Sequence, residues 1–92
     1  MKKFVCSVVD DFVYGGCLMR VDSTKIIIRL FAKKWLIMFE RIDSISVFKR
    51  SLYIDIDYTD NHNNMMSIKI LVLRRKKLLS LLEPKLDCIK YR

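Results

Sequence analysis

The sequence predicts a small antiparallel β-structure that is closed by a single C-terminal helix. Seven short apolar runs follow one another along the chain, and each is bounded by residues typical of turns. After them, the spacing of the leucines changes from the two-residue period of a strand to the three- and four-residue period of a helix. We expect one mainly β domain over residues 1–92, because a chain of this length holds a single hydrophobic core.

The first half of the chain contains four predicted strands. Residues 4–9 are rich in β-branched side chains, and residues 12–14 extend this strand after a break at Asp10 and Asp11. Gly15 and Gly16 predict a tight turn, because glycine adopts a positive φ without steric cost. The next strands are expected over residues 17–21, 25–31 and 35–39, with turns at residues 22–24 and 32–34.

The second half supplies three more strands. A short connection at residues 41–43 is expected to place Ile42 in the core, and residues 44–48 alternate so that Ile45 and Val47 share a face. Residues 52–58 alternate strictly, which is typical of a half-buried antiparallel strand. The apolar face there comprises Leu52, Ile54, Ile56 and Tyr58, and the polar face Tyr53, Asp55 and Asp57. After a polar loop, the last strand is expected over residues 65–73.

A helix is expected over residues 75–83, with a short tail over residues 84–92. Leu78, Leu82, Leu86 and Ile89 lie four, four and three residues apart, which gives one apolar stripe. Pro84 either ends this helix or kinks a continuation to Ile89. Four consecutive cations precede the leucines, although the positive end of a helix dipole disfavours cations. Either the first two belong to the preceding strand or an anion lies nearby.

The middle of the chain resembles the GRAM and bacterial members of the pleckstrin-homology-like (PH-like) superfold. The resemblance rests on residues 25–31, then 35–47, where Phe39-Glu40-Arg41-Ile42-Asp43-Ser44-Ile45 stands in place of an Ile-Pro-Tyr-like segment without the proline. It covers roughly residues 15–83 and implies a seven-stranded, bent, partly open barrel capped by the helix. Phosphoinositide-binding members carry a Lys-x-(Lys/Arg) motif near the first turn. This chain has Asp10, Asp11, Gly15 and Gly16 there, so we expect an interaction or self-assembly module rather than a specific lipid-headgroup receptor.

Charge and cysteine content indicate the kind of partner and the cellular location to expect. The net charge of +8 favours polyanions, either nucleic acid or an anionic membrane surface. The longest uncharged apolar run has five residues, too short for a membrane span, and no secretory signal is evident. Cys6, Cys17 and Cys88 are odd in number and lack metal-ligand spacing, so we expect reduced thiols in an intracellular, cytoplasmic protein, which could sit peripherally at a membrane.

Two basic segments are candidate anion- or partner-binding sites. Lys33 and Lys34 precede Trp35, which either contacts a membrane or nucleic acid or packs in the core beside a solvated turn. The second segment, Arg74, Arg75, Lys76 and Lys77, either holds phosphates or forms a solvated connection. In both cases the structural alternative is the more common one.

No pattern of residues predicts catalysis, a metal or a cofactor. Asp55 and Asp57 lack a third ligand at matching spacing, and His62 stands alone in a polar loop without a nucleophile. We therefore expect a non-enzymatic module that binds protein partners, including copies of itself, through an exposed edge strand near Tyr53. Two alternatives remain. One is a peripheral binder of anionic membranes. The other is a small nucleic-acid-binding protein whose β-face carries Arg29, Lys49, Arg50 and Lys69.

Overall fold

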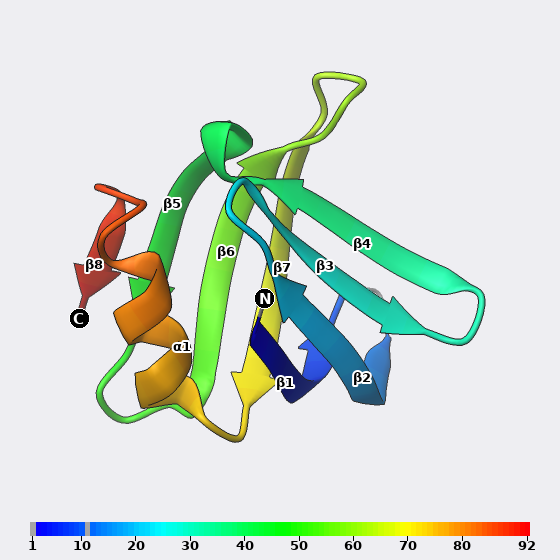
Figure 1. Ribbon diagram of the computed structural model, residues 1–92, viewed down its shortest axis with the longest axis horizontal. Helices are drawn as coiled ribbons and strands as arrows, with labels where there is room; N and C mark the ends of the chain where they lie inside the picture. Colours follow the sequence, from blue (N-terminus) through cyan, green and yellow to red (C-terminus); the bar gives the residue numbers. More distant parts are fainter. Residues whose placement is uncertain (1, 11) are drawn as a thin grey trace.

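The computed structural model describes residues 2–10 and 12–92, which form one sheet and one α-helix (Figure 1). The elements are β1 (Lys2–Val9), β2 (Val13–Val21), β3 (Lys25–Leu30), β4 (Lys33–Met38), a 3-10 turn (Phe39–Arg41), β5 (Ile42–Val47), β6 (Tyr53–Thr59), β7 (Met65–Val72), α1 (Arg75–Leu82) and β8 (Ile89–Tyr91). The strand order is β4-β3-β2-β1-β7-β6-β5-β8. The sheet is open, and the prediction of a mainly β domain with one C-terminal helix is confirmed.

Strand β1 divides the sheet into two halves, because it pairs with β2 on one side and with β7 on the other. The strands β2–β4 run at an angle to β5–β7, and α1 lies against the latter half (Figure 1). Alternate residues of both halves point into one common core, as the period of two requires. Ile42, Ile45 and Val47 are buried as predicted, and α1 adds Leu78, Leu79 and Leu82 to the same core.

The predicted number of seven strands is wrong, because the segment expected as a tail contains β8. This strand has three residues and runs parallel to β5, with Ile45 beside Ile89. The chain turns at residues 83–85 instead of continuing as a kinked helix, and the buried Leu86 fixes its return toward β5. A strand of three residues is too short to produce a periodic signal in the sequence.

The predicted turn at Gly15 and Gly16 is also wrong, because both glycines lie inside β2. Strand β1 ends at Val9 and β2 begins at Val13, and Asp10 and Phe12 lie between them; Asp11 lies outside the described residues. Cys6 pairs with Cys17 and Val8 with Tyr14, so Ser7 faces two glycines and the strand bulges there. Gly16 has a φ of +72°, which glycine allows. Residues 13 and 14 consequently belong to β2 and do not extend β1.

The turn between β3 and β4 consists of Phe31 and Ala32, one position earlier than predicted. Lys33 and Lys34 therefore belong to β4. Phe31 has a positive φ of 51° and is fully exposed to solvent. Leu52, which was expected on the apolar face of its strand, precedes β6 and is 70% exposed.

The edge strand expected near Tyr53 is not an edge. Its strand, β6, is paired with β5 on one side and with β7 on the other. The outermost strands of the sheet are β4 and the three-residue β8. Of these two edges, the six-residue β4 is the longer one available for strand addition.

Candidate functional site

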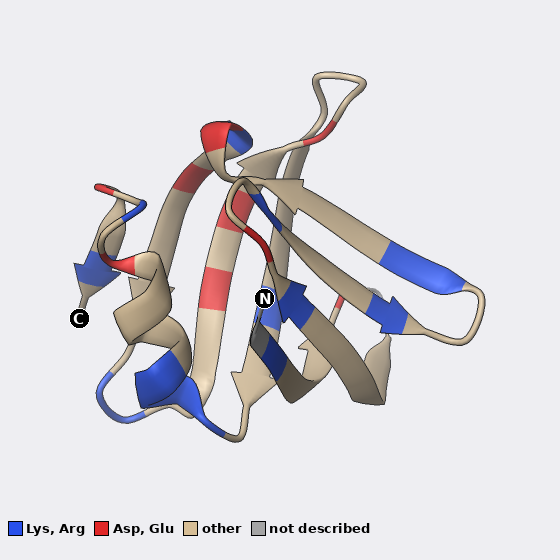
Figure 2. Ribbon diagram, viewed as in Figure 1, with Lys and Arg blue, Asp and Glu red and all other residues tan. Residues whose placement is uncertain are grey.

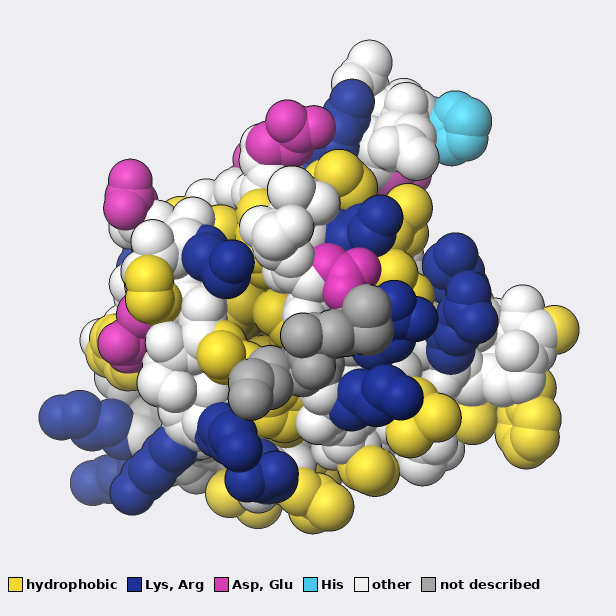
Figure 3. All heavy atoms as spheres, in the orientation of Figure 1, with side chains coloured by type: hydrophobic (Ala, Val, Ile, Leu, Met, Phe, Trp, Pro, Cys, Tyr) yellow, Lys and Arg dark blue, Asp and Glu magenta, His cyan; other side chains and the backbone are white. Residues whose placement is uncertain are grey.

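The strongest concentration of charge lies where the β5–β6 turn meets the start of α1. Arg75 joins these segments, because its Nη1 donates a hydrogen bond of 2.6 Å to the carbonyl oxygen of Ser51. We call this surface the basic corner. It consists of Lys49, Arg50, Leu52, Leu73, Arg74, Arg75, Lys76 and Lys77. Figures 2 and 3 show its cations grouped at one end of the molecule.

The structure shows where the four consecutive cations lie relative to the helix start. Strand β7 ends at Val72, so Arg74 is the N-cap of α1 and Arg75 its first residue. The explanation that the first two cations belong to the strand is therefore wrong. The first turn contains no acidic residue, and no side chain caps it. The positive end of the helix dipole thus adds to the field of the side chains.

Carboxylates do not neutralise the basic corner. Among the residues that the structure describes, the one ion pair joins Arg20 and Asp22 at 4.0 Å, on β2 and the turn after it. The cations of the corner face solvent, apart from the half-buried Arg75. An anion that approached this corner would therefore meet six cations and no competing acid within salt-bridge distance.

Two leucines lie among these cations. Leu73 is 80% exposed and occupies the turn between β7 and α1, and Leu52 lies across from it. Together with the cations of residues 74–77 they line a hollow of about 460 Å³. The corner therefore combines positive charge with exposed apolar area.

The second predicted site, at Lys33, Lys34 and Trp35, lies at the tip of the β3–β4 hairpin. Trp35 is 6% exposed, and its indole Nε1 donates a hydrogen bond of 3.3 Å to Oδ2 of Asp10, so the core alternative is correct. Lys33 is held by the aromatic residues, because its Nζ donates to the Tyr14 hydroxyl at 3.1 Å and lies 5.4 Å from the Trp35 ring centroid. The tip and the basic corner lie at different ends of the molecule (Figure 2).

Further cations lie on the outer face of β1–β4. This face carries Lys3, Arg20, Lys25, Arg29 and Lys34, interleaved with Val5, Leu18, Ile27 and Leu36. Arg29 and Lys34 are direct cross-strand partners. Like charges in that position repel each other.

The residues of the predicted nucleic-acid face lie on separate elements. Arg29 lies on β3 and Lys69 on β7, where its cross-strand partner is Asp55, while Lys49 and Arg50 belong to the basic corner. The outer face of β6 also holds Asp57, whose Oδ2 accepts a hydrogen bond of 3.1 Å from Ser44 Oγ. The described residues contain no group of three acids, histidines or cysteines that could hold a metal ion.

The polar loop between β6 and β7 is organised by Asp60. Its carboxylate accepts hydrogen bonds from the backbone N–H groups of Asn64 and His62, and these bonds lower the pKa of Asp60. His62 is exposed, and it contacts the Asp60 carboxylate through its backbone N–H. This arrangement explains the loop as a local turn.

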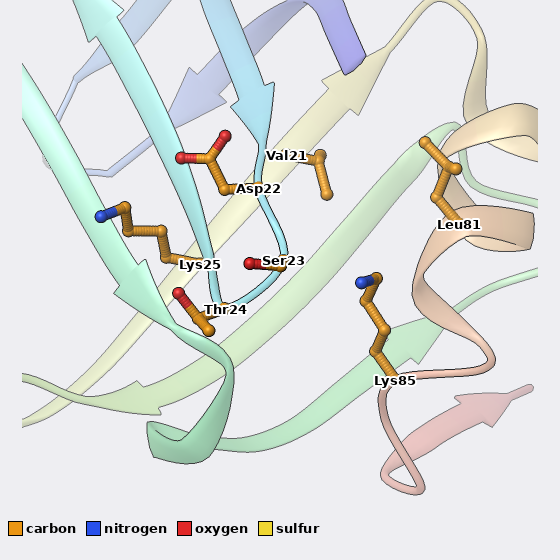
Figure 4. A pocket seen from close by; sticks show the side chains of 7 residues that line it. All are labelled: Val21, Asp22, Ser23, Thr24, Lys25, Leu81 and Lys85. Atoms are coloured by element: carbon orange, nitrogen blue, oxygen red, sulfur yellow. The ribbon is translucent and has the colours of Figure 1, made fainter. Parts of the chain in front are cut away.

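A hollow of about 570 Å³ separates the β2–β3 turn from the end of α1 (Figure 4). Val21 and Leu81 face each other across it, and Lys85 extends into it from the segment after the helix. The Lys85 ammonium lies 6.0 Å from the ring centroid of Phe39. Asp22 also lines this hollow, so its charges are mixed, and it offers no convergent set of groups for one ligand.

Sequence reasoning identified residues 74–77 but missed the other half of the corner. Lys49, Arg50 and Leu52 are distant in sequence, and only the packing of α1 against the second half of the sheet brings them to the same place. Comparison of the chain with family models, curated proteins and solved structures gives no match. None of the helices in the described part of the chain is long and apolar enough to cross a bilayer.

Proposed function

We propose that this protein binds peripherally to anionic lipid surfaces through the basic corner. The observation that carries the proposal is the gathering of six cations, without a competing acid, around the exposed Leu52 and Leu73. Anionic headgroups are attracted by clustered Lys and Arg, and apolar side chains bury in the headgroup region. Nucleic acid is the less favoured ligand, because binding of its bases calls for aromatic platforms and the corner presents leucines.

The expected affinity follows from the side chains of the corner. Each cation near an anionic membrane surface contributes about 1 kcal/mol, so six contribute about 6 kcal/mol. Burial of Leu52 and Leu73 adds at most roughly 1.5–3 kcal/mol each. After the entropy lost on association, the sum supports reversible attachment in the micromolar range.

The proposal includes a PH-like identity for the fold. It is supported by the order of the first seven strands, in which β1 connects two antiparallel halves, and by a helix directly after β7. The strand β8 is an addition to the expected pattern. In such a fold, the start of α1 would contact the lipid surface, and the first turn, where Asp10 lies, would not.

The test compares two variants with the same change of net charge. In the first, Lys49, Arg50, Lys76 and Lys77 are replaced by Gln, and Arg75 is kept because it bonds to Ser51. In the matched control, the cations of the outer face of β1–β4 are replaced: Lys3→Gln, Lys25→Gln, Arg29→Gln and Lys34→Gln. Sedimentation with phosphatidylcholine vesicles, with and without about 30% phosphatidylserine, measures the bound fraction.

We expect the corner variant to bind phosphatidylserine vesicles about 1,000-fold more weakly, because four cations at about 1 kcal/mol each are lost. The control should lose less than about tenfold, because only the long-range attraction is reduced. Equal losses in both variants would show that net charge alone drives binding and would refute the site. Binding to a single-stranded oligonucleotide without binding to vesicles would favour nucleic acid instead.

A further inference from the structure

Strand β4 has an unpaired edge whose backbone groups can be assigned. The Phe39 N–H donates to the carbonyl oxygen of Thr24 at 2.9 Å, and this pair continues the β3–β4 ladder in register. Hydrogen-bonded pairs alternate along an antiparallel ladder, so residues 33, 35 and 37 bond to β3. The N–H and C=O groups of Lys34 and Leu36 therefore point away from the sheet. Strand β4 is the last in the strand order, and its outer edge has no neighbour among the described strands (Figure 1).

The side chains beside this edge carry an uncompensated charge. Lys34 and Arg29 form a non-hydrogen-bonded pair, the closer of the two kinds of cross-strand pair. The line of cross-strand neighbours continues from Arg29 to Leu18 on β2 and Val5 on β1, and it holds no acid. Like charges in direct opposition destabilise a sheet, and a carboxylate beside Lys34 would relieve that repulsion. Leu36, 41% exposed, follows on the same face.

We infer that β4 accepts an extended acidic peptide from a protein partner as a ninth, antiparallel strand. The open N–H and C=O groups of Lys34 and Leu36 supply the ladder, and acidic residues at alternate positions of the peptide lie beside Lys34 and Arg29. This is recognition by strand addition, in which the backbone provides affinity and the alternate side chains provide specificity. It is independent of the basic corner, which lies elsewhere on the molecule.

A second copy of this chain fits the edge less well. A two-fold axis at Leu36 would set Lys34 beside Met38 of the other copy. The cross-strand partner of Met38 is Lys25, so Lys34 would meet another cation there. An axis at Lys34 would oppose two lysines. Neither arrangement supplies a carboxylate, and each copy carries a net charge of +8. Charge complementarity therefore favours an acidic partner.

The probe is a labelled peptide of about 12 residues in which Glu alternates with Val, and the control peptide has Lys in place of Glu. Fluorescence anisotropy measures binding to the wild type, to Leu36→Pro and to Leu36→Thr. Proline removes the outward N–H without touching the bonds to β3, whereas threonine keeps that N–H and introduces a β-branched side chain that suits a strand. A thermal unfolding curve checks that each variant folds.

We expect the wild type to bind the Glu peptide and to bind the Lys peptide at least tenfold more weakly. For the Glu peptide, Leu36→Pro should lose roughly tenfold in affinity, whereas Leu36→Thr should stay within about threefold of the wild type. Lys34→Glu should reverse the preference between the peptides. If Leu36→Pro does not fold, amide hydrogen exchange of the wild type decides the question. The Glu peptide should then protect the amides of Lys34 and Leu36 and leave those of Trp35 and Ile37, already bonded to β3, unchanged.

Equal binding of the peptide by Leu36→Pro and Leu36→Thr would overturn the inference, as would the absence of new amide protection. A wild-type dimer that Leu36→Pro dissociates, seen by sedimentation velocity without peptide, would also overturn it and assign the edge to a second copy. The corner variant separates this inference from the proposed function, because it should bind the peptide normally and lose the vesicles.

Discussion

Replacing Phe31 by glycine should stabilise the protein, although it removes a large apolar side chain. Phe31 occupies the first position of a two-residue hairpin turn at a φ of 51°, where glycine is favoured. The left-handed conformation costs an L-residue about 1–2 kcal/mol, and the greater freedom of glycine in the unfolded chain costs about 0.5–1 kcal/mol. The ring is fully exposed, so no burial is lost. The difference between these two costs predicts that Phe31→Gly raises the free energy of unfolding by about 0.5–1 kcal/mol.

Urea unfolding followed by circular dichroism measures this gain, and thermal unfolding should show a rise of about 3–6 °C in Tm. Phe31→Ala is the matched control, because it removes the ring and keeps the unfavourable φ. We expect Phe31→Ala to stay within about 0.5 kcal/mol of the wild type, as surface substitutions usually do. If Phe31→Gly is less stable than the wild type, the ring must pack against the protein, and the reasoning from the turn is wrong.

Two further predictions concern the core. Leu82→Ala should lower the free energy of unfolding by roughly 2–5 kcal/mol in urea titration, because its side chain is fully buried in the common core; a loss below about 1 kcal/mol would mean that α1 docks elsewhere. Burial, with a smaller contribution from Cys17, raises the pKa of the Cys6 thiol from 9.0 to about 12. The folded state therefore holds this proton more tightly, and stability should fall between pH 9 and pH 12 by up to about 1.4 kcal/mol per pH unit. Cys6→Ala should reduce this alkaline slope in urea titrations at several pH values, and an unchanged slope would contradict the assigned burial.

The elements that sequence reasoning placed well are those with a long, regular apolar period. Residues 53–59 and 65–72 alternate over many positions, and the leucines of residues 78–82 repeat at helical spacing. Each pattern can bury its apolar residues in only one way. The failures have local causes. Gly16 was correctly expected to suit a positive φ, but the same backbone conformation serves a bulge as well as a turn.

The position of the candidate site could be predicted only in part. The run of cations at residues 74–77 is visible in the sequence, and so is the shortage of acids near it. Whether these cations lie beside Lys49 and Arg50 depends on where α1 packs, and that packing is a contact between residues far apart in the sequence. The central position of β6, which removes the expected edge near Tyr53, likewise follows from strand order and not from the pattern of the strand itself.

By itself, the sequence determined a mainly β structure with one helix near its C-terminal end, because hydrophobic period and turn chemistry act between neighbours along the chain. Only the tertiary structure decided which strand has a free edge, that residues 89–91 add a parallel strand, and that two basic segments form one corner. Those features depend on pairing between residues that are far apart in the chain, and local pattern does not encode such pairing.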